Sequence, residues 1–433
     1  MFIAESVGII ADDLTGANDT ALQFFLKGCN TKILTTETEI PENTRETNVW
    51  AIQTESRNVS PEEAYRKVFR AAKFLTETLK VEHLYKKIDS TIRGNIAIEI
   101  TAVLDASDYE AAVVIPAFPN EGRITLGGFQ LVKGVPLERT EFARDPKYPI
   151  YESHIPTSLK YGLPEKDKNL VDLIDFNTVK QGAGPILARL NELISKGKKI
   201  IVIDSVSSVD IEQIVLAIKK CNRRVLTCGS SGAAKGICNI LFPSMEYEKK
   251  PFEIPKLPRL IISGSATQLA ASQIKRIESD EDVENTYFIE VTPEQILNSD
   301  KEEIIEKAIK NLVRQNTVVI HTSELFKNPD SLTVMLFDKE ISRDPFISMI
   351  CDFLADITKI IAEQKDIILI TIGGETSSKC MKALGTDCLN IVDAVAPAIP
   401  LCSDDKSRYI VTKSGNLGTV STLIEVLKFF GDE

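Results

Sequence analysis

The sequence has little that would mark a membrane or secreted protein. Its 433 residues contain no apolar run approaching the roughly 20 residues that a membrane helix needs. Residues 1–6 carry neither a basic segment nor a small-residue cleavage pattern, so we expect no signal peptide. The eight cysteines are scattered and form no CxxC pair, which is typical of reduced thiols. We therefore expect a cytoplasmic protein with no membrane partner.

Histidine is scarce, and two familiar phosphate-binding motifs are missing. The only histidines, His83, His154 and His321, are dispersed and form no HExxH, so we predict no metal site. The sequence contains neither GxxxxGK[ST] nor GxGxxG, which argues against a standard P-loop or dinucleotide fold. Residues 229–235 imitate a phosphate loop without its spacing, and we interpret them as a strand-to-helix turn. The net charge of -11 argues against a nucleic-acid partner but leaves room for a small anion held by a few cations.

Apolar β-like runs alternate with amphipathic helical segments along the chain. Several runs are continuously apolar, as expected for strands covered on both faces. The strand candidates are residues 7–11, 49–54, 84–88, 111–115, 200–204, 225–228, 260–263, 317–321 and 367–372. This alternation predicts an α/β protein in which two domains each have a mainly parallel sheet flanked by helices.

The length of the chain and one change in composition predict where the domains lie. A chain of 433 residues is too long for one ordinary core. Residues 245–259 carry Pro251, Pro255 and Pro258 among many charges, which favours an extended connector. We expect a first domain at 1–245, a linker at 246–259 and a second domain at 260–433.

Two helix starts can be predicted from capping residues. Ser60, followed by Pro61 and Glu63, predicts a helix that begins at Pro61. Ser299 with Glu302 predicts a second capping box ahead of another amphipathic run.

An acidic pair follows the first predicted strand. Asp12 and Asp13 stand in the string IADDLTGAND, and ligands of open α/β sheets bind beyond the carboxyl ends of strands. Two carboxylates there could accept a proton, grip ligand hydroxyls or hold a cation. The pair could equally be an acidic helix start that favours the helix dipole.

The predicted strand at 84–88 leads into KKIDSTIRGN, which has the same placement. Lys87 and Arg93 supply charge, and Asp89 and Ser90 supply groups for hydroxyls, which suits an anionic, polyhydroxylated ligand. The alternative is a polar turn that caps a helix. Arg57, at another strand end, taken alone resembles a solvated surface arginine.

A further loop, residues 116–125, follows another predicted strand. Its prolines and glycines predict an irregular conformation, and Arg123 could reach a cleft. The prolines themselves favour a structural turn.

The second half of the chain has glycine-rich strings at three predicted strand ends. Glycine lets backbone N–H groups approach phosphate oxygens, and a helix N-terminus adds positive potential. Each string alone is a weak signal, because strand-to-helix turns use glycine anyway. The strings are SGSAT at 263–267, GGET at 373–376 and KSGNLG at 413–418. Three of them in one domain favour a nucleotide site.

Taken together, the motifs resemble those of the four-carbon acid sugar kinases, and the resemblance spans nearly the whole chain. The strings that carry it are IADDLTGAND at 10–19, TESR at 54–57, KIDSTIRGN at 87–95, PAFPNEGR at 116–123 and GVPLERTEFARDP at 134–146, with SGSAT, GGET and KSGNLG in the second half.

The resemblance implies an N-terminal domain that binds a sugar acid and a C-terminal domain that binds ATP. It implies phosphorylation of a terminal hydroxyl of threonate, erythronate or a 3-oxo relative. By this likeness the acceptor contacts are Asp12, Asp13, Arg57, Lys87, Ile88, Asp89 and Ser90. The ATP contacts are Ser263, Ser265, Gly373, Gly374, Glu375, Thr376, Gly415 and Gly418.

The mechanistic hypothesis follows from what phosphoryl transfer requires, which is positioning, charge neutralisation and an oriented hydroxyl. Lys87, Arg93 and Arg57 would hold the acceptor carboxylate or the transferring phosphate. Asp12 or Asp89 would orient the hydroxyl and take its proton. Mg²⁺ would bridge the ATP phosphates with few protein ligands.

Two alternatives stay open at this stage. One is an aldolase, dehydrogenase or isomerase that acts on the same acids. The other is a non-catalytic sugar-acid sensor or binding protein, which has no need of three glycine-rich strand ends. The sequence determines neither the stereoisomer of the acid nor the oligomeric state, and a homo-oligomer is one of the possible states.

Overall fold

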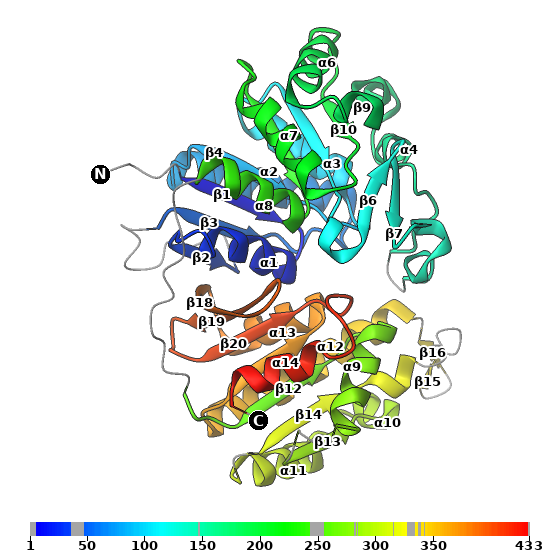
Figure 1. The fold of residues 1–433 in the computed structure, drawn as a ribbon. Coiled ribbons are helices and arrows are strands. Elements are labelled where there is room, and N and C mark those ends of the chain that lie inside the picture. Colours follow the sequence, from blue (N-terminus) through cyan, green and yellow to red (C-terminus); the bar gives the residue numbers. More distant parts are fainter. Residues whose placement is uncertain are drawn as a thin grey trace. The chain divides into compact units, whose positions relative to one another are not determined.

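The computed structural model describes residues 6–35, 47–145, 148–242, 255–280, 283, 285–314, 316–326, 334–336, 339–341 and 343–431 (Figure 1). The chain divides into two compact units, Met1–Glu248 and Lys249–Glu433. The predicted linker at 246–259 falls largely outside the described residues, so its limits stay a prediction.

The first unit is built on a parallel sheet with the strand order β2-β3-β1-β4-β11-β5-β10-β9. Its strands are β1 Val7–Ala11, β2 Thr31–Leu34, β3 Val49–Gln53, β4 His83–Lys87, β5 Ala111–Ile115, β9 Val171–Ile174, β10 Ile200–Ile203 and β11 Val225–Gly229. Every residue of β1, β3 and β5 is buried, as the continuously apolar runs predicted.

Helices cover both faces of this sheet. They are α1 Leu14–Phe25, α2 Pro61–Lys73, α3 Ile96–Ala106, α4 Ile155–Tyr161, α5 Phe176–Val179, α6 Ala183–Ser195, α7 Ser208–Lys219 and α8 Ser231–Leu241, with shorter turns η1 Phe74–Thr78, η2 Pro119–Glu121, η3 Leu137–Arg139, η4 Glu141–Arg144 and η5 Glu165–Leu170. Helix α8 packs against α1 and α7, while α2 packs against α3. Right-handed crossovers in opposite directions along the sheet place these two groups on opposite faces.

Two local predictions for this unit are confirmed. Ser60 is the N-cap of α2, and its side chain accepts a hydrogen bond from the amide of Glu63 at 3.3 Å. Residues 229–235 form the strand-to-helix turn between β11 and α8, with Ser230 as the N-cap.

A small antiparallel sheet extends from the first unit after β5. It consists of β6 Arg123–Leu126, β7 Phe129–Val132 and β8 Val135–Pro136. The turn between β6 and β7 is held by Asp204, whose carboxylate accepts hydrogen bonds from the amides of Gly127 at 2.7 Å and Gly128 at 2.8 Å. Burial raises the pKa of Asp204, and these amide bonds partly offset that rise. The carboxylate therefore fixes the hairpin at the end of β10.

The second unit has a mixed sheet with the order β13-β14-β12-β17-β20-β19-β18. The strands are β12 Arg259–Ser263, β13 Thr286–Glu290, β14 Thr317–His321, β17 Ile368–Ile372, β18 Cys388–Ala396, β19 Ile399–Asp404 and β20 Tyr409–Lys413, and a separate hairpin is formed by β15 Val334–Leu336 and β16 Lys339–Ile341. Neighbouring strands in the series β13, β14, β12, β17 and β20 pair parallel. Strand β19 pairs antiparallel with both β20 and β18. Both units therefore have the predicted class, a mainly parallel sheet flanked by helices.

Helices α9 to α13 of the second unit lie between consecutive strands, and α14 follows the last strand. They are α9 Gln268–Glu278, α10 Pro293–Asn298, α11 Glu302–Leu312, α12 Arg343–Gln364, α13 Gly374–Leu384 and α14 Thr422–Phe429, with the short turn η6 Ser323–Phe326. Helix α9 packs against α14, and α12 packs against α13.

The capping box predicted at Ser299 and Glu302 is wrong. Ser299 lies after α10 in the left-handed conformation, with φ of 54°, and Lys301 occupies the N-cap position of α11 without a capping hydrogen bond from its side chain. The capping box of this region is one helix earlier, where Thr292 and Gln295 bond reciprocally at the start of α10. Ser299 is needed to end one helix and so cannot begin the next.

The order of strands reverses once in each sheet. In the first unit the chain moves from β1 to β2 and β3 on one side and then to β4 on the other. In the second unit it moves from β12 to β13 and β14 and then to β17 on the other side. Such a reversal opens a crevice at the carboxyl ends of the two central strands, since the loops that follow them leave in opposite directions. The topology therefore points to the ends of β1 and β4 and of β12 and β17.

Among the described residues, no helix is long and apolar enough to cross a membrane.

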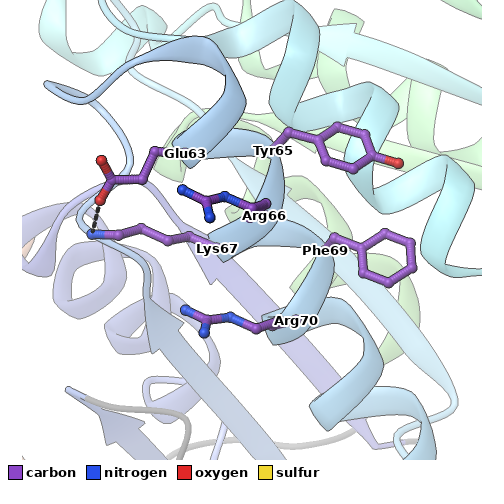
Figure 2. A pocket seen from close by; sticks show the side chains of 6 residues that line it. All are labelled: Glu63, Tyr65, Arg66, Lys67, Phe69 and Arg70. Atoms are coloured by element: carbon purple, nitrogen blue, oxygen red, sulfur yellow. Dashed lines mark ion pairs between the residues drawn. The ribbon is translucent and has the colours of Figure 1, made fainter.

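One pocket lies away from the strand ends described above. A pocket of about 390 Å³ lies along α2, where Figure 2 shows Arg66, Lys67 and Arg70 on one side and the rings of Tyr65 and Phe69 on the other. None of the residues predicted for the site lines this pocket.

A buried ion pair ties β4 to α3. The ammonium of Lys86 lies 2.8 Å from the carboxylate of Glu99, and both side chains are almost fully buried. Lys86 also donates to the carbonyl of Lys87 at 2.7 Å. Lys86 thus stabilises the fold, although it stands next to a predicted site residue.

Removing the carboxylate of Glu99 is expected to destabilise the first unit. In Glu99→Ala the ammonium of Lys86 stays buried without its counter-ion, and breaking a buried pair typically costs about 3 kcal/mol of unfolding free energy. Chemical denaturation at neutral pH measures the loss. The matched control is Lys67→Ala, which breaks an exposed pair with Glu63 at 3.6 Å and should cost about 0.5 kcal/mol. Equal losses in the two variants would contradict the assignment of Lys86 to the core.

Candidate functional site

The strands that lead to the predicted acceptor residues of the first unit end in register with one another. Ala11, the last residue of β1, is in register with Gln53 of β3 and with Lys87 of β4. Lys87 is in register with Gly229 of β11. The loops that follow these strands therefore leave the sheet side by side, at the crevice between β1 and β4.

Asp12, Asp13 and Arg57 form an ion-pair cluster at this crevice. The guanidinium of Arg57 contacts both oxygens of Asp12, at 2.7 and 3.0 Å, and its third nitrogen lies 2.7 Å from Asp13. Asp13 is also the N-cap of α1 and accepts a hydrogen bond from the amide of Gly16 at 2.7 Å. Arg57, which taken alone resembled a surface residue, is thus held by the two aspartates that follow β1.

The charges in this cluster fix its protonation. Burial raises the pKa of Asp12, but the charge and hydrogen bonds of Arg57, helped by Lys86 and Lys87, outweigh burial and lower the pKa overall. Burial lowers the pKa of Arg57, and the neighbouring aspartates raise it well above its usual value. Asp12 is therefore an anion held in one orientation.

The loop that carries Arg57 is held by residues that follow β4. The amide of Asn95 donates to the carbonyls of Ser56 at 2.8 Å and Val59 at 2.9 Å. Gly94 has φ of +95°, and a Cβ there would lie 3.0 Å from Cγ of Arg57. Asn95 and Gly94 thus have a structural role in the KIDSTIRGN string.

Lys87 differs from every other cation of this crevice. Its side chain is buried, and among the residues that the structure describes its ammonium makes no hydrogen bond and no ion pair within 4.0 Å. A Cβ on Gly16 would lie 2.8 Å from Nζ of Lys87, so only glycine lets the ammonium approach the start of α1 so closely. A buried ammonium without a hydrogen bond is costly and indicates a place for an anionic ligand.

Asp89 and Arg93 form a second cluster in the loop after β4. Two nitrogens of Arg93 contact the two oxygens of Asp89 at 2.7 and 3.3 Å, and a third lies 2.9 Å from Asp145. The guanidinium also lies over the ring of Phe142, 5.6 Å from its centroid. Burial raises the pKa of Asp89, but Arg93 and Arg57 outweigh it and hold the pKa well below its usual value.

Ile88 and Ser90 flank Asp89 in the loop after β4. The hydroxyl of Ser90 accepts a hydrogen bond from Arg123, and its carbonyl accepts one from Gln130 at 2.7 Å. Burial lowers the pKa of Arg123, and the charge of Asp89 partly offsets this. The amide of Ile88 donates to the carbonyl of Gly229 at 2.9 Å, and the Ile88 side chain is buried. The β6–β7 hairpin therefore positions Ser90, which Arg123 contacts directly.

Three contributors were missed by the sequence reasoning. Gln130, Asp145 and Phe142 hold Ser90 and Arg93 from outside the predicted segments. The only available signal was the string GVPLERTEFARDP, which contains Phe142 and Asp145 and carried the resemblance without a stated role.

The three glycine-rich strings of the second unit also converge. Ser263 of β12 is in register with Ile372 of β17, and Ile372 is in register with Lys413 of β20. The side chain of Thr267 links two of the strings, since it bonds Ser265 at 3.1 Å and donates to the carbonyl of Gly415 at 2.8 Å. The amide of Gly373 donates to the carbonyl of Lys413 at 2.9 Å and links the third.

Close packing requires glycine at these strand ends. A Cβ on Gly415 would lie 2.0 Å from Oγ of Ser265, and one on Gly418 would lie 2.3 Å from Oγ1 of Thr422. Gly373 has φ of +110°, a region that side chains disfavour, and it begins α13 without a side-chain cap. The first backbone amides of α13, those of Gly374, Glu375 and Thr376, therefore lie at the strand ends without a capping side chain.

No cluster of acidic, histidine or cysteine side chains suited to a metal ion occurs in the described part of either unit. The carboxylates of Asp12, Asp13 and Asp89 form ion pairs with arginines instead.

The fold and the two crevices define a two-domain α/β protein with a polar, charged site in its first unit and a glycine-rich site in its second. Comparisons with known proteins agree with this division. Residues 7–237 match the model of a sugar-binding N-terminal domain, and residues 260–423 match that of a nucleotide-binding C-terminal domain.

Several curated proteins match over nearly their whole length. A D-threonate kinase of Salmonella typhimurium is 31% identical over 97% of this chain and 97% of its own. A D-erythronate kinase of Heliobacterium modesticaldum is 31% identical over 90% and 88%. A 3-oxo-tetronate kinase of Haemophilus influenzae is 25% identical over 95% and 97%. The chain belongs to the family of four-carbon acid sugar kinases, as the motifs predicted.

Solved structures share the fold. A crystal structure from Salmonella typhimurium has a TM-score of 0.76 at 21% identity, covering 97% of this chain and 98% of that one. One from Haemophilus influenzae has a TM-score of 0.70 at 22% identity, covering 98% and 100%.

Removing Arg57 is expected to lower the unfolding free energy at neutral pH by more than at acidic pH. In the wild type the pKa of Asp12 is depressed, so its stabilising contribution is present above the unfolded pKa and is lost as the pH falls through the folded one. In Arg57→Ala burial dominates and the pKa of Asp12 rises. We expect the variant to lose about 3 kcal/mol of unfolding free energy at neutral pH, and the loss to shrink as the pH approaches about 4.

Urea denaturation at a series of pH values measures this change. The double variant Arg57→Ala/Asp12→Asn removes the buried charge and should show a smaller loss that varies less with pH. A loss in Arg57→Ala that stays constant over this range would show that Asp12 is not the group responsible.

Proposed function

We propose that the protein is an ATP-dependent kinase that phosphorylates the terminal hydroxyl of a four-carbon sugar acid to give its 4-phosphate. The substrate class is D-threonate, D-erythronate, L-threonate or 3-oxotetronate. The relatives named above as kinases of such acids match 90% to 97% of the chain, which supports the proposal. The single observation that carries it is the buried ammonium of Lys87, which has no hydrogen bond among the described residues and lies at the crevice of the predicted sugar-binding domain.

The acceptor fits the charges of the first unit. Lys87 is the cation available to a ligand anion, either the carboxylate of the acid or the transferring phosphate. Asp12 and Asp89 are held as anions by Arg57 and Arg93, and their remaining lone pairs can accept hydrogen bonds from acceptor hydroxyls. Asp13, Ile88 and Ser90 complete the acceptor contacts predicted from the sequence. Arg93 and Arg57 chiefly orient these carboxylates.

The nucleotide fits the second unit. Phosphate oxygens favour helix N-termini, and α13 begins at Gly374 after the N-cap Gly373, which has no side chain to cap it. The hydroxyls of Ser263, Ser265 and Thr376 lie near the same strand ends, and Gly415 and Gly418 allow a close backbone approach. Glu375, in the first turn of α13, is suited to a hydrated cation.

Mg²⁺ is proposed as the metal that accompanies ATP. When bound, it bridges phosphate oxygens and neutralises the charge that develops during transfer. Because ATP supplies most of the oxygen ligands, one carboxylate such as Glu375 and ordered waters suffice on the protein side. We place the reaction in the cytoplasm, where ATP is available.

A coupled assay of ADP formation tests the proposal. With Mg²⁺ and ATP, we expect turnover with at least one of D-threonate, L-threonate, D-erythronate and 3-oxotetronate, and loss of turnover on addition of EDTA. Gly415→Ala should raise the KM for ATP at least tenfold, because its Cβ would displace Ser265. Gly184→Ala is the matched control, since no atom lies within 4 Å of the position that its methyl group would take, and its KM should be unchanged.

The result that would overturn the proposal is binding of a sugar acid with no ADP formed from any of the four. That outcome would favour a non-catalytic sugar-acid sensor. Consumption of an acid without ATP would favour an aldolase, dehydrogenase or isomerase.

A further inference from the structure

A further carboxylate, that of Asp19, lies near the acceptor crevice. Asp19 lies on α1, one turn beyond Gly16. Residues three apart on a helix share a face, so Asp19 and Gly16 face the same way. Gly16 is the residue that lets the ammonium of Lys87 approach α1. Asp19 is thus placed beside the predicted acceptor site.

The groups around Asp19 come from several elements of the first unit. The hydroxyl of Thr20 donates to its carboxylate at 3.0 Å, and the hydroxyl of Ser231, at the start of α8, also faces it. The hydroxyls of Thr20 and Ser231 lie 3.3 Å apart. The charged and titratable groups that feel the Asp19 charge are Asp13, Tyr85 and Lys87 in the strand-end layer and Arg123 on β6.

Asp19 differs from the other carboxylates of the crevice in its partners. Asp12 and Asp13 share the guanidinium of Arg57, and Asp89 is held by Arg93. Within the described part of the chain, no arginine or lysine nitrogen lies within 4.0 Å of Asp19. A carboxylate that is held by a guanidinium is a weak proton acceptor, whereas one bonded only by hydroxyls keeps its basicity.

Its ionisation agrees with this difference. Burial raises the pKa of Asp19 above the usual value, and the charge of Lys87 and the hydroxyl of Ser231 offset only part of the rise. The pKa values of Asp12 and Asp89 are instead lowered. Environments that raise the pKa of one carboxylate and lower the pKa values of its neighbours are typical of sites where one of them exchanges a proton.

We propose that Asp19 is the catalytic base of the phosphoryl transfer, rather than Asp12 or Asp89. This inference rests on the proposed kinase function. The O–H bond of the acceptor hydroxyl breaks as its oxygen bonds to the γ-phosphorus, and the proton passes to the carboxylate of Asp19. The bond between the γ-phosphorus and the bridging oxygen breaks, and ADP leaves with that electron pair. Lys87, whose charge acts on both Asp12 and Asp19, holds the anionic group of the acceptor within reach.

The test is steady-state kinetics of Asp19→Asn in the full chain, with Mg²⁺, ATP and the acid that the wild type uses best. We expect kcat to fall about 100-fold to 10,000-fold, the range typical of a lost general base. The KM values for the acid and for ATP should change less than threefold. In the wild type kcat should fall as the pH falls through the pKa of Asp19, and this acidic limb should be absent from the residual activity of the variant.

A second variant distinguishes the loss of a base from misfolding of the variant. Asp19→Glu keeps a carboxylate and should retain at least tenfold more activity than Asp19→Asn, with the acidic limb restored. The control is Asp108→Asn, which alters an exposed carboxylate paired with Arg224 and should leave the kinetics unchanged. Unfolding curves of all variants should show the native transition.

The outcomes separate this inference from the function on which it rests. If the wild type forms no ADP with any of the acids, both fall. If the wild type is active and Asp19→Asn keeps its kcat within threefold, only the role of Asp19 falls. If Asp19→Asn instead raises the KM for the acid and keeps the acidic limb, Asp19 merely positions Lys87, and the base is elsewhere.

Discussion

The reversal of strand order in each parallel sheet is the constraint on which the site depends. Parallel strands place all their carboxyl ends at one edge, and the loops after β1 and β4, or after β12 and β17, leave that edge in opposite directions. The backbone between them is left uncovered, so side chains and amides at the strand ends can face a ligand. Four of the strings that carry the family likeness, IADDLTGAND, KIDSTIRGN, SGSAT and GGET, lie at the ends of these four strands.

The two crevices have the same topology but contain different chemical groups. In the first unit, Asp12, Asp13 and Asp89 are paired with the guanidinium groups of Arg57 and Arg93 before any ligand binds, and Lys87 and Asp19 stand apart from these pairs. The second unit presents glycines, hydroxyls and the uncapped start of α13 instead. Fixed ion pairs suit a small polyhydroxylated acid, whose hydroxyls need oriented acceptors. Backbone amides suit phosphate groups, which need close approach and little side-chain bulk.

Much of this arrangement could be predicted from the sequence, because continuously apolar runs locate buried parallel strands and polar residues mark where they end. The runs at 7–11 and 111–115 match β1 and β5 residue for residue. Pairings between distant segments could not be predicted in this way. Arg57 meets Asp12 across 45 residues, and Arg93 meets Asp145 across 52, so the sequence near each residue contains no trace of its partner. The same holds for Asp19, which in the sequence is one more polar residue on a helix.

The central claim is that the strand ends of the first unit bind the sugar acid and those of the second unit bind the nucleotide. Amide hydrogen exchange, followed by mass spectrometry with each ligand added alone, measures this most directly. The account predicts that the acid slows exchange at residues 12–16, 54–57 and 87–95. A magnesium complex of a non-hydrolysable ATP analogue should slow it at residues 263–267, 373–376 and 414–418. Protection of the second set by the acid, with the first set unchanged, would contradict the account.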